Sequence, residues 1–399
     1  MEKPLQGIIV LDLSRLIAGP ACCMYLADMG AEVVKIEPPE GDGTRFLAPF
    51  SETIPEGRLF TPFNRNKRCL ALNIFSGEGK VVFLDLVKKA DVVVHNFRPK
   101  VVAAEGLDYP SLKKVNSKLV YCAIAGYSPR GPNQDRPGLD FALQAESGLM
   151  SITGEPDGDP LKIPFPVIDL QASAYAAMAI AAALAARERD GQGRLVETTL
   201  FAAGVSLLAE RAWAYLFSGE VPKRTGNWGI IGGLLSAYFQ TSDGGLIITL
   251  PTQKMWQQFC EVREFSHLGK DPRFEDIRKR NSNRDQLVAE LKKVFRQKTT
   301  QEWVQKLARE KGLVCSPVRS LVEVFADAEV EALGLVREVE HPVYGRRKVL
   351  GIPFEFPETP LEVSHLAPPI GWHTDEILRS YLKMDQVEIN RLRKKKVIS

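Results

Sequence analysis

The chain has 399 residues, of which 45% are hydrophobic and 25% charged, and its formal net charge is +3. This composition is typical of a protein that buries a large core, and the small net charge argues against nucleic-acid binding as the default function. The six cysteines form no C-x-x-C pair, so we interpret them as reduced thiols of a cytoplasmic protein. No signal peptide is visible at Met1, and we expect no membrane span.

Apolar runs alternate with helical patterns through residue 200, which predicts a mostly parallel α/β sheet. The predicted strands cover residues 7–13, 31–37, 91–95, 119–125 and 194–200. The first strand–helix–strand unit ends at Glu37, as nucleotide-binding units do, but its turn reads SRLIAGP and lacks the G-x-G-x-x-G pattern. We therefore expect a Rossmann-like sheet and keep an NAD-binding oxidoreductase as an alternative.

Two segments rich in glycine and proline, 38–63 and 126–140, follow predicted strands. Open α/β sheets bind ligands at the carboxyl ends of their strands, so both segments are candidate binding loops. NRNKR places Arg65, Lys67 and Arg68 before a strand, where they either meet a phosphate or form an exposed basic loop. His95 ends another strand and is either a ligand contact or a core histidine.

Asp169 ends the apolar run IPFPVIDL and precedes an alanine-rich segment that predicts a helix of roughly five turns. Gly191 and Gly193 stop this helix. One interpretation makes Asp169 the N-cap of the helix. The other makes it a carboxylate nucleophile near the positive end of the helix dipole. The local pattern allows both.

The sequence pattern changes after Phe217. A glycine cluster precedes a predicted hairpin with Asp243-Gly244 at its turn, and helical patterns follow at 254–263, 284–297 and 300–311. EHPVYGRRKVLGIPFEF predicts further strands, and HTDEILRSYL predicts a closing helix with Thr374 as N-cap. We predict a large Rossmann-like domain over 1–220, a small α+β domain over 221–328, and a C-terminal segment over 329–399 that returns to the large domain.

Several stretches together resemble one family, in the same order and at matching spacing from about Lys3 to about Leu382. They are LDLSRLIAGPACCMYLADMGAEVVKIEPPEGDGTR, NRNKR, HNFRP, YCAIAGYSPRGPNQDRPGLDFALQAESGLMSITG, VIDLQAS, SDGG, EHPVYGRRKVLGIP and GWHTDEIL. This pattern resembles the class III CoA-transferases of the CaiB/BaiF type. The resemblance implies an interlocked homodimer, a CoA thioester as substrate, and neither a metal nor a permanently bound cofactor.

The resemblance also implies that Asp169 attacks an acyl-CoA thioester and passes through an aspartyl anhydride and an aspartyl-CoA thioester. The residues that it places beside CoA are Ile17, Ala18, Leu72, Asn73, Asn96, Phe97, Arg98, Arg136, Leu139 and Asp140. Relatives of the formyl-CoA transferase branch carry basic residues where this chain has Pro38, Ala104 and Pro137. The candidate substitutes as CoA phosphate ligands are Arg45, Lys67, Arg68, Arg98 and Arg136.

Three further expectations concern the active site. A glycine segment, Gly229–Gly233, closes over Asp169, and Gly232-Gly233 and the loop after Leu13 are candidate oxyanion donors. An α-methylacyl-CoA racemase is one alternative, although Gly138-Leu139-Asp140 lacks the histidine of that class. A CoA-binding partner subunit of a hetero-oligomer is another. The apolar residues expected near the acid favour one larger than formate, such as a dicarboxylate; they are Leu16, Phe46, Phe50, Leu139 and Trp228.

Overall fold

The structure is a computed structural model that describes residues 1–47, 49–51, 54–229 and 235–399. The chain divides into two compact units. The larger contains Met1–Leu149, Lys162–Gly219 and Ala328–Ser399, and the smaller contains Met150–Leu161 and Glu220–Asp327. The domain bounds predicted from the sequence stay a prediction.

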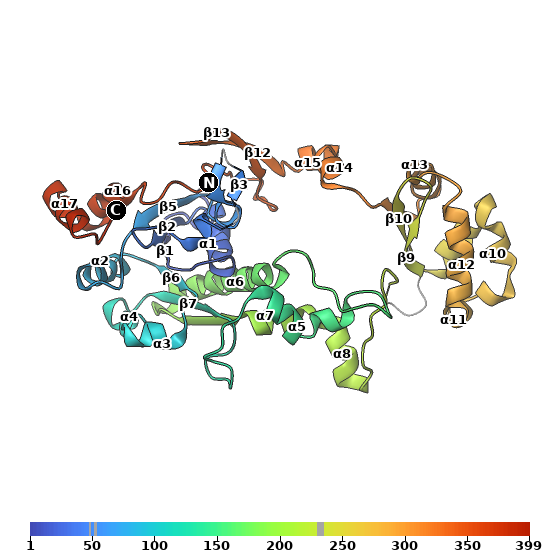
Figure 1. The fold of residues 1–399 in the computed structure, drawn as a ribbon, viewed down its shortest axis with the longest axis horizontal. Helices are drawn as coiled ribbons and strands as arrows, with labels where there is room; N and C mark the ends of the chain where they lie inside the picture. The colour runs from blue at the N-terminus through green and yellow to red at the C-terminus, as the bar shows by residue number, and fades with distance from the viewer. Residues whose placement is uncertain (48, 52–53, 230–234) are drawn as a thin grey trace. The chain divides into compact units, whose positions relative to one another are not determined.

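A six-stranded parallel sheet forms the centre of the larger unit, with strand order β5-β2-β1-β6-β7-β8 (Figure 1). Leu11 of β1 pairs with Val34 on one side and Val93 on the other. Buried apolar side chains dominate β1, β6 and β7 at the centre of the sheet, as expected for strands covered on both faces. The bounds are β1 Ile9–Asp12, β2 Glu32–Glu37, β5 Lys67–Ala71, β6 Val92–His95, β7 Val120–Ala125 and β8 Leu195–Thr199. The predicted α/β class is confirmed.

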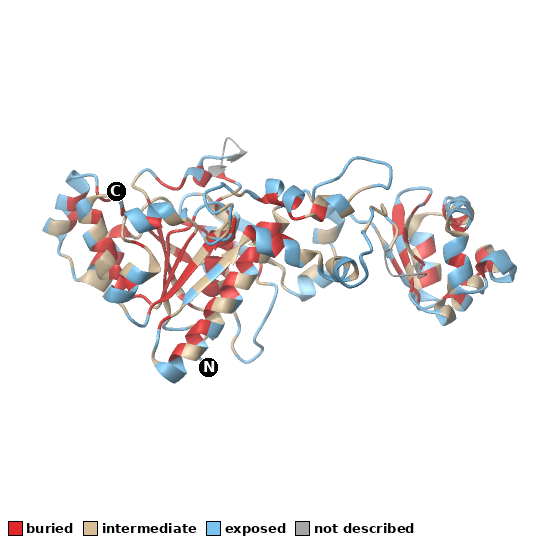
Figure 2. Ribbon diagram, turned by 90° about the horizontal axis from the view of Figure 1, so that it is seen from below, coloured by how far each residue is buried: buried red, intermediate tan, exposed pale blue. Residues whose placement is uncertain are grey.

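Helices cover both faces of this sheet, and the red interior in Figure 2 marks the buried strands and inward helix faces. One face packs against α1 (Ala18–Asp28), α6 (Val167–Asp190) and α7 (Leu200–Leu207). The other packs against α2 (Gly77–Val87), α4 (Tyr109–Val115), α16 (Thr374–Leu382) and α17 (Gln386–Lys394). The remaining elements of the larger unit are β3 Pro49–Ser51, β4 Ile54–Gly57, α3 Pro99–Ala104, α5 Asp140–Glu146, α8 Ala209–Ser218, α15 Ala328–Ala332, β12 Val336–His341 and β13 Gly345–Leu350.

Helix α6 runs for 24 residues, longer than the predicted five turns, because it begins before Asp169. Small residues on its inner face, such as Ala172 and Ala176, let it approach α1 closely. Gly191 ends it with a φ of 71°, as predicted. By length and composition α6 could cross a membrane, and so could the bent pair α7 and α8 taken together, but α6 is packed in the core of this unit. A cytoplasmic location stays a prediction.

The smaller unit is a three-stranded antiparallel sheet, β11-β10-β9, packed against helices. Phe259, Phe265 and Trp303 stack in its core with ring centroids 4.0 to 5.3 Å apart. The hairpin predicted at Asp243-Gly244 is confirmed. The bounds are β9 Leu235–Gln240, β10 Gly245–Leu250, α9 Gln253–Cys260, α10 Ser266–Lys270, α11 Ile277–Ser282, α12 Arg284–Phe295, α13 Thr300–Val304, β11 Val314–Pro317 and α14 Leu321–Phe325.

The C-terminal segment packs on the larger unit, where the backbone N–H of Asn73 donates to the carbonyl of Val397. The prediction that Thr374 is the N-cap of the closing helix is wrong. Thr374 is the first residue of α16 and His373 precedes it as N-cap. The Thr374 hydroxyl instead accepts from the backbone N–H of Ala71, at the end of β5, with a separation of 3.2 Å. This side chain therefore joins the helix to the sheet.

Candidate active site

The strand order reverses direction between β1 and β6, which is where open α/β sheets bind their ligands. The loop after β1 is fixed there by Asn96, which follows β6. Arg15 N–H donates to Asn96 Oδ1 at 2.9 Å, and Asn96 Nδ2 donates to the Arg15 carbonyl at 2.6 Å. The next residue, Leu16, has a φ of 64°, a conformation that is uncommon for a side chain of this kind. The loop that opens α1 is therefore held in one defined shape.

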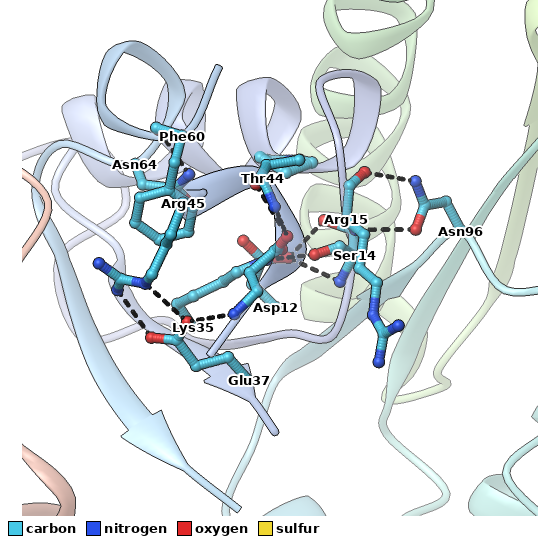
Figure 3. A network of polar contacts seen from close by, with 12 residues as sticks. Asp12, Ser14, Arg15, Lys35, Glu37, Thr44, Arg45, Phe60, Asn64 and Asn96 are labelled. Carbon is cyan, nitrogen blue, oxygen red and sulfur yellow. Dashed lines mark hydrogen bonds and ion pairs between the residues drawn. The ribbon is translucent and has the colours of Figure 1, made fainter. Parts of the chain in front are cut away.

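A network of buried ion pairs and hydrogen bonds lies beside this loop (Figure 3). Lys67 donates to Asp12 at 2.9 Å, Lys35 lies 3.3 Å from Asp42, and Arg45 binds Glu37 with two nitrogens. Burial alone would raise the pKa of Asp12, but Lys35 and Lys67 outweigh it and lower the pKa to about 2. Ser14 contacts both an acidic and a basic member of this network. Its hydroxyl donates to Asp12, and its carbonyl accepts from Lys35.

The basic residues of NRNKR belong to such pairs and do not form an exposed loop. Lys67 is fully buried, and Arg65 is buried against Asp28 at 2.7 Å. Arg68 is paired with Glu32 and Glu376. The interpretation as an exposed basic loop is therefore wrong.

Lys67 and Arg45, two of the candidate phosphate ligands, are held in buried ion pairs. Lys67 is committed to Asp12 and Arg45 to Glu37, and Arg45 is only 1% exposed. A charge that is already paired inside the protein is not available to a phosphate without leaving its carboxylate partner uncompensated.

A shallow hollow lies at the reversal point between β1 and β6. Its lining brings together residues from the ends of β1, β5 and β6, among them Arg15, Leu72, Asn73, Ile74, Phe75 and Phe97. Three of these, Leu72, Asn73 and Phe97, are predicted CoA contacts. Arg15 was not singled out from the sequence, yet its guanidinium lies 5.5 Å from the centre of the Phe97 ring and its side chain points away from the buried carboxylates (Figure 3). Among the described residues, it makes no ion pair.

Asp169 is the third residue of α6 and is 9% exposed. The interpretation as N-cap is wrong, because Pro166 occupies that position and the Asp169 carboxylate makes no capping bond. No hydrogen bond or ion pair to this carboxylate is found within the described part of the chain. Burial, with a second contribution from the charge of Asp140, raises its pKa to about 7. A buried carboxylate without a partner is a candidate reactive group.

The surroundings of Asp169 come from three helices. Asp140, the first residue of α5, accepts from the backbone N–H groups of Ile168 and Asp169 at 2.8 and 3.0 Å. On the α1 side, Ser173 Oγ lies 2.7 Å from the carbonyl oxygen of Ala18 and 2.6 Å from that of Asp169. The predicted residues Ile17 and Ala18 therefore lie at the start of a helix that is packed beside the Asp169 turn.

The other predicted site residues are more scattered. Arg136 is exposed and binds Glu146 at 2.6 Å, while its guanidinium lies over the Tyr127 ring. Leu139 is 60% exposed and directly precedes Asp140, and Arg98 is exposed after β6. His95 is buried at the end of β6, and burial lowers its pKa to about 4, so it is neutral at physiological pH. Gly232 and Gly233 lie outside the described residues.

A larger hollow, about 450 Å³, lies at the opposite end of the same sheet. It is open and polar, and its buried arginine, Arg187, is already bonded to Asp91 at 2.9 Å. This hollow is remote from the carboxyl ends of the strands, so we place the candidate active site at Asp169 and the reversal point between β1 and β6.

Comparison with known proteins identifies the family to which this α/β fold belongs. Residues 5–374 match the sequence profile of "CoA-transferase family III". Mouse succinyl-CoA:glutarate CoA-transferase is 35% identical over 394 residues, covering 98% of this chain and 89% of that protein. The alpha subunit of succinyl-CoA–L-malate CoA-transferase from Chloroflexus aurantiacus is 32% identical, covering 100% of this chain and 93% of that protein.

A solved structure gives the same result. The crystal structure of a CaiB/BaiF family protein from Brucella suis superposes with a TM-score of 0.86 and 33% identity, covering 96% of this chain and all of that one. The chain belongs to CoA-transferase family III and is an enzyme of that family. Enzymes of this family use CoA thioesters as substrates, as the sequence predicted.

Proposed function

We propose that this enzyme moves CoA from an acyl-CoA donor to a carboxylic acid acceptor, with Asp169 as the covalent catalyst. The observation that supports this most is the state of the Asp169 carboxylate. It is nearly buried, has no partner within the described residues, and has a pKa of about 7. A desolvated carboxylate held in place attacks a thioester far more readily than one in water.

The proposed reaction balances in four steps. An Asp169 oxygen bonds to the acyl carbon, the C–S bond breaks, and the electron pair leaves with CoA as thiolate. The thiolate then attacks the side-chain carbonyl of Asp169, and the donor acid leaves as carboxylate. The acceptor carboxylate attacks the resulting aspartyl-CoA thioester, and CoA is released again as thiolate. The thiolate finally attacks the acyl carbon of this second anhydride, which frees Asp169.

The start of α1 supports this chemistry. Each attack creates an oxyanion that needs hydrogen-bond donors already in place. No side chain caps α1, and Ser173 ties this helix to the Asp169 turn. Gly19 allows the close approach of the loop, because a Cβ at this position would lie 2.1 Å from the Ser14 Cβ. Backbone N–H groups at the start of α1 are therefore the proposed oxyanion donors.

The experiment that tests this function compares two substitutions on the same helix. Asp169→Asn removes the nucleophile and should lower kcat for CoA transfer by at least about 1,000-fold. Asp190→Asn, at the exposed end of α6, is the matched control and should keep the rate within twofold of the parent, because Asp190 contacts the nearby Arg194 and the backbone N–H of Gln192, far from the turn that carries Asp169. Retention of substantial transfer by Asp169→Asn would contradict the proposal.

We place the nucleotide end of CoA in the hollow at the reversal point between β1 and β6. Phe75 and Phe97 supply aromatic surface there, and Arg15 supplies a guanidinium that carries no ion pair within the described residues. With Lys67 and Arg45 committed to buried pairs, Arg15 and the exposed Arg98 are the proposed phosphate ligands.

Substitution of these arginines tests the placement of CoA. Arg15→Ala should raise KM for the acyl-CoA roughly tenfold while changing kcat little, because a phosphate contact is made equally in ground and transition states. Arg189→Ala, which removes an exposed arginine in the last turn of α6 and outside both candidate binding loops, is the control. An unchanged KM for both Arg15→Ala and Arg98→Ala would show that the phosphates are held elsewhere.

We propose that the two acids are dicarboxylates. Both named relatives combine succinyl-CoA with a dicarboxylic acceptor, glutarate or L-malate. Leu16, Phe46 and Leu139 are exposed apolar residues of the larger unit, and the expectation that they contact the acid stays a proposal. Incubation of the enzyme with succinyl-CoA and a panel of C1 to C6 mono- and dicarboxylic acids, followed by mass spectrometry of the CoA esters, tests this. Preference for formate or for monocarboxylates would contradict it.

A homodimer is part of this proposal, and a partner subunit is the alternative. One relative carries the name of an alpha subunit, which motivates the alternative. The two are distinguished with the purified chain alone. Transfer activity that disappears in Asp169→Asn supports the complete enzyme, whereas an inactive chain that still binds CoA supports the partner-subunit role.

A further inference from the structure

Asp140 supplies the cap that α6 lacks. Pro166, at the N-cap position, makes no side-chain hydrogen bond, so the first N–H groups of the helix need acceptors from elsewhere. Asp140 Oδ2 accepts from Ile168 N–H at 2.8 Å and from Asp169 N–H at 3.0 Å. The turn that carries the proposed nucleophile is therefore fixed by a carboxylate from a different helix.

Gln144 holds Asp140 in this position. Its Nε2 donates to Asp140 Oδ1 at 2.6 Å, and its Oε1 accepts from Ile163 N–H at 2.8 Å. Gln144 is fully buried and Asp140 is 7% exposed. The segment before α5 passes close to the end of β7, where Gly126 and Gly138 are in contact. A Cβ on Gly126 would lie 2.7 Å from the Gly138 Cα, so this approach requires glycine. Both oxygens of Asp140 are thus occupied inside the protein.

The same arrangement places two carboxylates next to each other with no cation between them among the described residues. Charged groups on the neighbouring elements are engaged elsewhere: Glu146 with Arg136, Glu197 with Arg130, and Asp28 with Arg65. The other titratable side chains of these elements are the thiols and phenols Cys22, Cys23, Tyr25, Tyr121, Cys122, Tyr127 and Tyr175, and four charged residues at the end of α6, Arg187, Glu188, Arg189 and Asp190. Lys162, in the segment before α6, lies over the Phe141 ring with its nitrogen 3.7 Å from the ring centre. Asp140 is therefore the charge that Asp169 faces.

We propose that Asp140 is a positioning residue that fixes the first turn of α6 and whose negative charge favours the covalently modified, neutral form of Asp169 over the free carboxylate. This inference rests on the proposed role of Asp169. When Asp169 becomes an anhydride, its charge leaves with the CoA thiolate. This first step removes the repulsion between neighbouring like charges. When the anhydride becomes a thioester, the charge of the thiolate leaves with the donor carboxylate, and Asp169 stays neutral.

Two variants, one single and one double, separate the positioning role of Asp140 from the role of its negative charge. In Asp140→Asn, Oδ1 still accepts from α6, but the new amide faces the Gln144 amide, donor against donor. In Asp140→Asn/Gln144→Glu, the carboxylate of residue 144 accepts from the amide of residue 140 and still accepts from Ile163 N–H. The hydrogen bonds are restored, and the negative charge moves one helical turn away from Asp169.

The measured quantities are the pH profile of kcat/KM and the fraction of enzyme trapped as aspartyl-CoA thioester with succinyl-CoA. In the parent, kcat/KM should rise with pH through about 7, because the Asp169 carboxylate must be ionised. In the double variant this rise should move to lower pH, and the thioester fraction should fall at least threefold. Asp140→Glu keeps the charge but misplaces it, so the rise should stay in place while kcat falls.

An unchanged pH profile and thioester fraction in the double variant would overturn the charge role. Full kcat in Asp140→Asn would overturn the positioning role. If neither asparagine variant folds, Asp140→Glu decides. A shifted pH profile at full kcat in Asp140→Glu would then contradict the proposal. Absence of any Asp169 thioester in the parent enzyme is a different result, because it contradicts the proposed function itself.

Discussion

The Asp169 carboxylate is nearly buried, so its negative charge lowers the stability of the folded protein. Its pKa in the folded protein, about 7, lies above the ordinary value of 3.8, so the folded state binds more protons between about pH 4 and pH 7. Stability contributed by this group therefore falls as pH rises through that window and is constant above it. The site that needs this charge for catalysis loses stability because of it.

Replacement of Asp169 should for this reason stabilise the protein. Asp169→Asn should raise the free energy of unfolding by roughly 2 to 4 kcal/mol at pH 8 and by much less at pH 5, where the parent carboxyl is protonated. Chemical denaturation at the two pH values measures this, with Asp190→Asn as the control that changes little. An equal effect at both pH values would show that the Asp169 charge is not the cause.

Single residues also show where sequence reasoning ends. The position of Asp169 before an alanine-rich helix is visible in the sequence, but the residue that caps this helix is not, because Asp140 lies 29 residues before Asp169 and reaches α6 only through the fold. The same is true of Lys67, whose partner Asp12 lies 55 residues away. Arg15 stands in the SRLIAGP turn, and only the structure shows that it makes no ion pair within the described residues and lies near the Phe97 ring.

At the scale of elements, the buried ion pairs join β1, β2 and β5 below the loop that opens α1. These ion pairs hold the charged side chains in fixed orientations. Removal of one partner would leave the other as an uncompensated buried charge. Asp12 is the clearest case, with a pKa lowered to about 2 despite burial. Its contribution is present above its unfolded pKa near 4 and is lost as pH falls through about 2.

Lys67→Met tests this element. The change should cost about 3 to 5 kcal/mol of unfolding free energy at pH 7, because Asp12 then keeps only Lys35 as a counter-charge. Asp12→Leu combined with Lys67→Met should recover a large part of the loss. Urea denaturation measures both, and a cost below about 1 kcal/mol for the single variant would contradict the account.

Most strands and helices could be predicted from periodicity, because local patterns determine which segment is a strand and which a helix. Their ends could not always be predicted. Thr374 has the residue type of a cap but is bonded to Ala71 of a distant strand. Helix α6 begins at Val167, before Asp169, and its first N–H groups are satisfied by Asp140 from another helix, which no local pattern indicates.

At the scale of the whole molecule, α8 carries apolar side chains that its own unit does not cover. Leu216 and Phe217 are 80% and 77% exposed, and Trp213 stacks on Phe217 with ring centroids 4.8 Å apart. A patch of this kind is typical of a surface that meets another chain. This supports the proposed homodimer, although the interlocking itself was inferred only from the family resemblance.

Leu216→Glu should shift the protein from dimer to monomer at micromolar concentration, because it places a charge at the centre of the apolar patch. Val387→Glu is the matched control, since Val387 is 79% exposed on α17 and belongs to a different surface. Light scattering after size-exclusion chromatography measures the mass of each. A parent chain that is already a monomer, or a Leu216→Glu variant that remains a dimer, would contradict this assignment.

The alternation of strands and helices was enough to predict the parallel sheet, but not how distant segments are grouped. Met150–Leu161 belongs to the smaller unit through long-range contacts such as the bond from Gly226 N–H to the Gly154 carbonyl at 3.0 Å. Local periodicity contains no information on such contacts, which join segments more than 70 residues apart.

The most direct test of the account is to locate the covalent intermediate. The enzyme is incubated with succinyl-CoA, quenched with hydroxylamine or reduced with borohydride, digested and analysed by mass spectrometry. We predict a hydroxamate or an alcohol at Asp169 and none in the Asp169→Asn variant. Label on any other residue, or no label in an enzyme that is actively transferring CoA, would contradict the central claim that Asp169 forms the bond to the acyl group and to CoA.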